Sequence, residues 1–166
     1  LTKIYQAVNI YLGVTSDIPN RPAIALGAVE ITVEEMVAAF STFANEGVYI
    51  KPQLITRIED KNGVVIYQGV EESHDVVNKD VAYSIIKLME GVTESGTGSR
   101  LRWAASAPSN FLTGVPYNIK GPVAGKTGTS QNNSDGWFIG MVPNLAAGVW
   151  VGNEDRSAHF ESTSMG

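Results

Sequence analysis

The stretch Ala-Gly-Lys-Thr-Gly-Thr-Ser at residues 124–130 opens a series of three segments with β-strand composition. The three segments cover residues 122–130, 136–142 and 146–152. They are separated by Gln-Asn-Asn-Ser-Asp and by Pro143-Asn144, which are rich in residues that favour turns. Connections this short join antiparallel neighbours. The last third of the chain therefore predicts an antiparallel meander, with Trp137, Phe138, Val149 and Trp150 packed in its core.

Amphipathic patterns upstream predict helices that pack on this sheet, because apolar residues recur there every three or four positions. The expected helices cover residues 2–12 with a stop at Gly13, the segment from a Thr32–Glu35 capping box to Gly47, and residues 79–92 behind an Asn78 N-cap. Helices beside an antiparallel sheet define an α+β fold, with the helices packed on the sheet.

The remaining segments predict a hairpin and two loops. Residues 53–68 alternate like a β-hairpin, with Asn62-Gly63 as a two-residue turn. The acidic segment 70–77 and the Gly/Ser/Thr-rich segment 93–100 are expected to be loops, the second of them mobile.

The composition excludes several classes of protein. The chain has 166 residues, the size of one domain, and a formal charge of 12 − 17 = −5. An acidic chain without a Lys/Arg cluster is a poor ligand for nucleic acid or for an anionic membrane. No apolar run is long enough to span a bilayer. Without cysteine and with only two histidines, the sequence implies neither disulfides nor a metal site.

Two kinds of site use a Gly-Lys-Thr string. A phosphate-binding loop needs a glycine five positions before Gly125, but Lys120 stands there, and Gly128 would break the helix that must follow. The other site is the active-site strand of a serine acyl-transfer enzyme, in which Lys-Thr-Gly recurs. A Gly/Thr-rich strand with a surface lysine remains the plain structural alternative.

The residues suit acyl transfer. Lys126 supplies positive potential for an anionic substrate end, and Gly128 allows a close approach to the backbone. Thr127 and Thr129 offer hydroxyl donors to a carboxylate. Strand alternation puts Lys126 and Gly128 on one face and the two threonines on the other. A ligand that contacts both sets must lie along the strand's edge, so we expect an extended peptide substrate.

The flanking motifs carry a resemblance that covers essentially the whole chain. They are Ala25-Leu26-Gly27, the Phe-Ser-Thr-Phe-Ala-Asn-Glu-Gly stretch at 40–47, the segment 57–63, Gly96-Thr97-Gly98, the segments 125–129 and 135–140, and Gly-Val-Trp-Val-Gly at 148–152. In order and approximate spacing they resemble the transpeptidase domain of bifunctional (class A) penicillin-binding proteins. The resemblance implies a fold shared with serine β-lactamases.

The same resemblance implies the chemistry. The family cross-links peptidoglycan stem peptides through a serine acyl-enzyme, and β-lactams acylate that serine. Lys126 would act electrostatically, the Thr127 and Thr129 hydroxyls would hold the carboxylate, and the Thr129 N–H would donate to the oxyanion beside Gly128. No metal or organic cofactor is implied. The complete protein is expected outside the cytoplasmic membrane, anchored through a segment that this chain lacks.

The sequence departs from the family pattern in one respect. The S-x-x-K and S-x-N motifs normally precede the Ala-Leu-Gly segment with which this chain nearly begins. Residues 1–166 are therefore expected to be the C-terminal portion of the domain, without its serine nucleophile and inactive alone. Ser84-Ile85-Ile86-Lys87 and Ser130-Gln131-Asn132 match the two motifs by pattern only, because the first lies on a helix and the second directly follows Lys-Thr-Gly.

Two other functions stay open from the sequence. A D,D-carboxypeptidase or a β-lactamase would use the same strand and would be separated from a transpeptidase by its products. A non-catalytic folded fragment would bind ligands or only support structure. A domain cut through its interior should also expose an apolar face, so we expect the chain to associate with itself or with the missing part.

Overall fold

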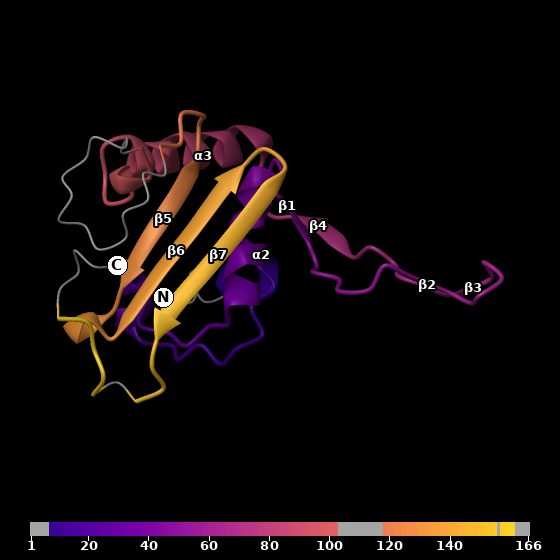
Figure 1. Cartoon of the computed structure of the whole chain (residues 1–166), viewed down its shortest axis with the longest axis horizontal. Helices are drawn as coiled ribbons and strands as arrows, with labels where there is room; N and C mark the ends of the chain where they lie inside the picture. The colour runs from indigo at the N-terminus through magenta and orange to yellow at the C-terminus, as the bar shows by residue number, and fades with distance from the viewer. Residues whose placement is uncertain (1–6, 103–117, 156, 162–166) are drawn as a thin grey trace.

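The computed structural model describes residues 7–102, 118–155 and 157–161 as one α+β arrangement (Figure 1). Its elements in chain order are a π-helical turn η1 (Ala7–Tyr11), 3-10 turn η2 (Pro22–Leu26), α2 (Val33–Ala44), β1 (Val48–Ile50), β2 (Arg57–Glu59), β3 (Val65–Gln68), β4 (Ser73–Asp75), α3 (Lys79–Glu94), 3-10 turn η3 (Ser99–Arg102), β5 (Ala124–Thr129), 3-10 turn η4 (Gln131–Asn133), β6 (Asp135–Val142) and β7 (Leu145–Gly152).

The predicted meander is confirmed as a three-stranded antiparallel sheet in the order β5-β6-β7. Lys126 pairs with Ile139, and Ile139 pairs with Gly148 on β7. Ile139 and Met141 are buried on the face that α2 covers. Gly148 lets the helix approach this closely, because a Cβ there would lie 2.5 Å from a Val37 methyl carbon.

Both predicted helix starts are confirmed by their caps. Thr32 accepts from the Glu35 N–H while the Glu35 carboxylate accepts from the Thr32 N–H, which makes the expected capping box. Asn78 caps α3 by accepting from the Val81 N–H at 2.9 Å. Because these bonds satisfy first-turn donors, each helix begins where its sequence signal lies.

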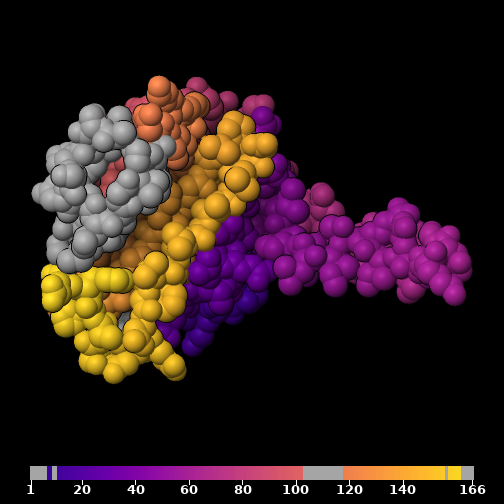
Figure 2. Space-filling view, viewed as in Figure 1, coloured from indigo at the N-terminus to yellow at the C-terminus, as the bar shows by residue number. Residues whose placement is uncertain are grey.

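The hairpin prediction is confirmed in type and wrong in its turn. Gly63 donates to the Asp60 carbonyl and the Asp60 N–H donates to the Val64 carbonyl, so three residues form the loop instead of two. Gly63 takes the left-handed conformation that closes such a loop (φ 82°). The hairpin of β2 and β3 projects from the body as an arm, and β1 paired with β4 lies at its base (Figures 1 and 2).

Several other expectations are wrong. The segment 70–77 is not only a loop, because β4 pairs with β1 there. The segment 93–100 is a loop only at residues 95–98, because α3 continues to Glu94 and η3 starts at Ser99. Val149 and Trp150 are half exposed and not core residues. Of the helix expected over 2–12, residues 1–6 lie outside the described residues and the rest forms a π-helical turn that ends before Gly13 (φ 66°).

Candidate active site

The Lys-Thr-Gly-Thr residues lie on β5, at the edge of the sheet. In the part of the chain that the structure describes, β5 pairs only with β6, so no strand occupies its outer edge. The register pairs Lys126 with Ile139 and Thr127 with Phe138. The predicted alternation is therefore confirmed: Lys126 projects from the face that α2 covers farther along the sheet, and Thr127 projects from the opposite face.

Glycines make room for the aromatic ring behind the site. A Cβ at Gly125 would lie 2.9 Å from Phe138 Cζ, and one at Gly140 would lie 2.9 Å from Phe138 Cε1. Gly128 has the same role beside Trp137, whose Cβ would be 3.1 Å from the added atom. The Phe138 and Trp137 side chains occupy the space where side chains at these three glycine positions would lie.

Lys126 is exposed, and its Nζ donates to the Thr127 carbonyl oxygen at 2.6 Å. Across residues 7–102 and 118–155, no carboxylate forms an ion pair with it. Its charge is therefore available to an anion that approaches the edge of β5.

The two threonines differ in their surroundings. Thr127 is half buried, and its Oγ1 lies 2.5 Å from Thr97 Oγ1 in the loop after α3. Thr129 is exposed and is the last residue of the strand. The loop Gly96-Thr97-Gly98 thus contacts the site strand.

Asp135 holds the end of the site strand. The Asp135 Oδ2 accepts from Ser130 Oγ at 2.7 Å, and the Asp135 backbone N–H donates to the same Ser130 Oγ at 2.9 Å. Its Oδ1 accepts from Trp150 Nε1 at 3.0 Å. The residue after Thr129 is thereby tied to both β6 and β7. Asp135 is the last residue of the Gln-Asn-Asn-Ser-Asp segment and the first residue of β6, and a carboxylate at that junction was the available signal in the sequence.

Both motif matches outside Lys-Thr-Gly lack the geometry of a nucleophile and base. Ser84 is exposed on α3 and donates to the Asp80 carbonyl within its own helix. Lys87 Nζ bonds Glu90 instead, and this carboxylate raises the pKa of the lysine, the opposite of what a general base requires. Ser130 is engaged by Asp135, and Asn132 lies in a turn at φ 58°.

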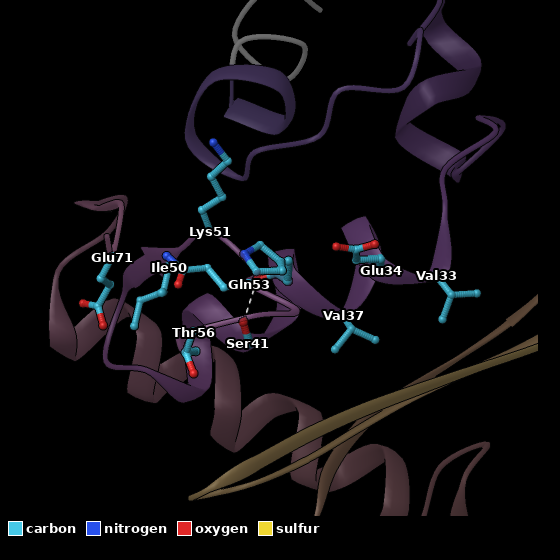
Figure 3. Close-up of a pocket in the computed structure, with 11 residues that line it drawn as sticks. Val33, Glu34, Val37, Ser41, Ile50, Lys51, Gln53, Thr56 and Glu71 are labelled. Carbon is cyan, nitrogen blue, oxygen red and sulfur yellow. Dashed lines mark hydrogen bonds between the residues drawn. The ribbon is translucent and has the colours of Figure 1, made fainter. Parts of the chain in front are cut away.

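A separate groove of about 540 Å³ lies between α2 and the base of the arm (Figure 3). The apolar residues Val33, Val37 and Ile50 line it together with the charged residues Glu34 and Lys51. No residue of β5 lines it, so this groove is not the predicted site. Within the described ranges, no group of three or more His, Asp or Glu side chains could hold a metal ion.

Comparisons with known proteins agree with this fold. The family described as "Penicillin binding protein transpeptidase domain" matches residues 18–162. Penicillin-binding protein 1A of Aquifex aeolicus is 35% identical over 136 residues, which are 82% of this chain and 17% of that protein. The solved D,D-transpeptidase domain of peptidoglycan glycosyltransferase from Eggerthella lenta is 28% identical, with a TM-score of 0.51 over 76% of this chain and 28% of its own. Penicillin-binding protein 1A from Haemophilus influenzae is similar in fold, with a TM-score of 0.73 at 20% identity over 95% of this chain and 27% of its own.

The chain therefore belongs to the penicillin-binding protein transpeptidase family, and within it to the transpeptidase domain of class A proteins. The family resemblance and the fold class expected from the sequence are confirmed. The chain spans 17% of the length of the Aquifex aeolicus protein and less than a third of each of the two solved chains. None of the helices in the described residues is long and apolar enough to cross a membrane.

Proposed function

We propose that this chain supplies one wall of the active cleft of a peptidoglycan D,D-transpeptidase. The observation that carries the proposal is the outer edge of β5, which no strand of the described residues occupies. Along that edge, in a chain of this family, the Lys126 side chain lies on one face of the strand and the Thr127 and Thr129 side chains lie on the other. In the reaction, a serine attacks the carbonyl of the terminal D-alanyl-D-alanine bond and releases D-alanine. An amine of a second stem peptide then takes the acyl group and frees the serine.

Each residue of the strand has a role in this step. Lys126 raises the positive potential where the serine oxygen and the substrate carboxylate meet. The Thr127 and Thr129 hydroxyls donate to that carboxylate, and the Thr129 N–H donates to the oxyanion. Gly128 carries no side chain of its own, so the backbone of an extended peptide can lie along the strand's edge beside it.

The proposal places the nucleophile outside residues 1–166, so this chain alone is inactive. Two contacts support this placement of the nucleophile: the Ser84 hydroxyl donates a hydrogen bond within its own helix, and Lys87 pairs with Glu90. The partners are then the peptidoglycan stem peptide, β-lactams as covalent inhibitors and the N-terminal part of the same domain. The complete enzyme works on the outer face of the cytoplasmic membrane, anchored by another segment of the protein.

Labelled penicillin tests the proposal. The isolated chain and a protein that carries the complete domain are incubated with it, followed by intact mass and peptide mapping. We expect an adduct only on the complete protein, at a serine outside residues 1–166. Lys126→Ala should slow acylation by about 100-fold or more, the cost of removing one oriented electrostatic group, whereas Lys61→Ala at the exposed arm tip should not.

Other outcomes would point elsewhere. An adduct on Ser84 of the folded isolated chain would overturn the assignment of the nucleophile. Release of free D-alanine without cross-linking would identify a D,D-carboxypeptidase instead of a transpeptidase.

A further inference from the structure

The end of α3 is fastened to the segment that enters β5. Thr93 is fully buried, and its hydroxyl donates to the Val123 carbonyl at 2.6 Å. Arg102 donates to Thr93 Oγ1 and to the carbonyl oxygens of Ile119 and Gly121 at 3.2 and 2.7 Å. The loop after α3 and the site strand therefore share one rigid frame, in which a side chain on the loop has a fixed place beside β5.

Gly96 and Gly98 allow the loop to pack closely against the helix and the sheet. A Cβ at Gly96 would lie 2.8 Å from Val92 Cα, and one at Gly98 would lie 3.3 Å from the Val92 carbonyl oxygen. Gly98 is buried and donates to that carbonyl at 2.9 Å. The residue between the two glycines is Thr97, and this close packing brings it to the site strand.

Thr97 Oγ1 lies 2.5 Å from Thr127 Oγ1. A hydroxyl has one proton and two acceptor positions. If Thr127 is to donate to a substrate carboxylate, the proton between the two oxygens must come from Thr97. A hydroxyl that accepts one bond also becomes a stronger donor in the next.

We propose that Thr97 is a positioning residue of this site: its hydroxyl donates to Thr127 Oγ1 and so directs the Thr127 proton toward the carboxylate of the substrate. The inference rests on the proposed function and extends it to a residue outside the Lys-Thr-Gly strand. It assigns Thr97 a part in carboxylate recognition and no contact with the reacting atoms.

The test compares two substrates on the protein with the complete domain. A labelled penicillin carries the carboxylate, and its methyl ester does not. Thr97→Val removes the hydroxyl at nearly constant shape, and we expect it to lower the acid-to-ester ratio of acylation rates by about tenfold, the loss of one hydrogen bond to a charged group. Thr97→Ser should restore the ratio, and Thr97→Ala, which adds no volume, should lower it as valine does. Thr56→Val is the matched control, because Thr56 is also exposed and lies far from Thr97 in the sequence.

A double-mutant cycle separates positioning from general support. Thr127→Val should lower the same ratio, and adding Thr97→Val should lower it no further, because the two residues act in one chain of bonds. An unchanged ratio in Thr97→Val, an equal loss with acid and ester, or full additivity would overturn this inference while penicillin still labels the wild type. An unlabelled wild type would overturn the proposed function and the inference with it.

Discussion

At the residue scale, Glu35 joins two parts of the chain that are far apart in sequence. Beyond the capping box with Thr32, its Oε1 accepts from the N–H and hydroxyl of Thr15 and from the Ser16 N–H at 2.6 to 2.8 Å. Burial raises the pKa of the Glu35 carboxyl, but the hydrogen bonds from Ser16, Thr32 and Thr15 outweigh it and hold the pKa well below its ordinary value of 4.5.

This depressed pKa predicts acid sensitivity. The carboxylate's contribution to stability is fully present above the ordinary pKa of 4.5 and is lost as the pH falls below that value toward the lower folded pKa. We expect Glu35→Gln to lower the free energy of unfolding by about 1–3 kcal/mol at pH 7 and to flatten its fall in acid. Chemical unfolding from pH 7 to pH 3 measures this. The exposed neighbour Glu34→Gln is the control, and an equal loss in both variants would contradict the assignment.

Gly125 gives a second prediction at this scale. It is buried, and a methyl group there would meet the Phe138 ring at 2.9 Å and the Ile139 carbonyl oxygen at 3.0 Å. Because the oxygen is backbone and cannot swing aside, Gly125→Ala should cost about 1–3 kcal/mol of unfolding free energy. Gly121→Ala, where a Cβ meets nothing within 4 Å, should be neutral in the same unfolding titration. If the two variants have equal stability, the ring does not fill the glycine's space.

At the element scale, local signals in the sequence were sufficient for some elements and not for others. The caps at Thr32 and Asn78 and the turns between β5, β6 and β7 act within a few residues, so the sequence alone predicted them. The pairing of β4 with β1 joins Ser73 to Ile50, and nothing in a polar Ser-His-Asp strand announces such a distant partner.

The candidate site divides in the same way. Lys126, Thr127, Gly128 and Thr129 were identified from their pattern, and their functional roles stay predictions. The contacts that fix the strand, Thr97 on Thr127 and Asp135 on Ser130, depend on a loop after α3 and on the first residue of β6. Such contacts become visible only when tertiary structure brings separate segments together.

The arm of β2 and β3 should open locally more easily than the rest of the molecule. A two-stranded hairpin is marginally stable in water by itself, and every residue of both strands is exposed. We expect its backbone amides to exchange hydrogen through local opening, well before those of the central strand β6, whose amides should require near-global unfolding. Exchange followed by mass spectrometry, with the Ile139–Met141 peptide as the internal reference, measures this. Equal protection would mean that the arm unfolds with the body.

At the scale of the whole molecule, the sheet has one face that the described residues leave open along β7. Leu145, Val149 and Val151 alternate on the face opposite α2 and are 62%, 51% and 52% exposed. Apolar side chains gathered on one surface favour association, because contact removes them from water. An apolar face of this kind is consistent with the sequence-based expectation that the isolated chain associates.

The isolated chain should therefore show a sedimentation coefficient that rises with concentration. Placing a charge on the open face, as Val149→Lys does, should raise the dissociation constant at least tenfold, about 1.4 kcal/mol, because the lysine would have to be desolvated in the contact. Val64→Lys on the arm is the matched control and separates this face from the hairpin as the associating surface. A wild-type chain that sediments as a monomer at every concentration and melts cooperatively would show that the open face needs no cover, which would count against the expectation that these residues are part of a larger domain.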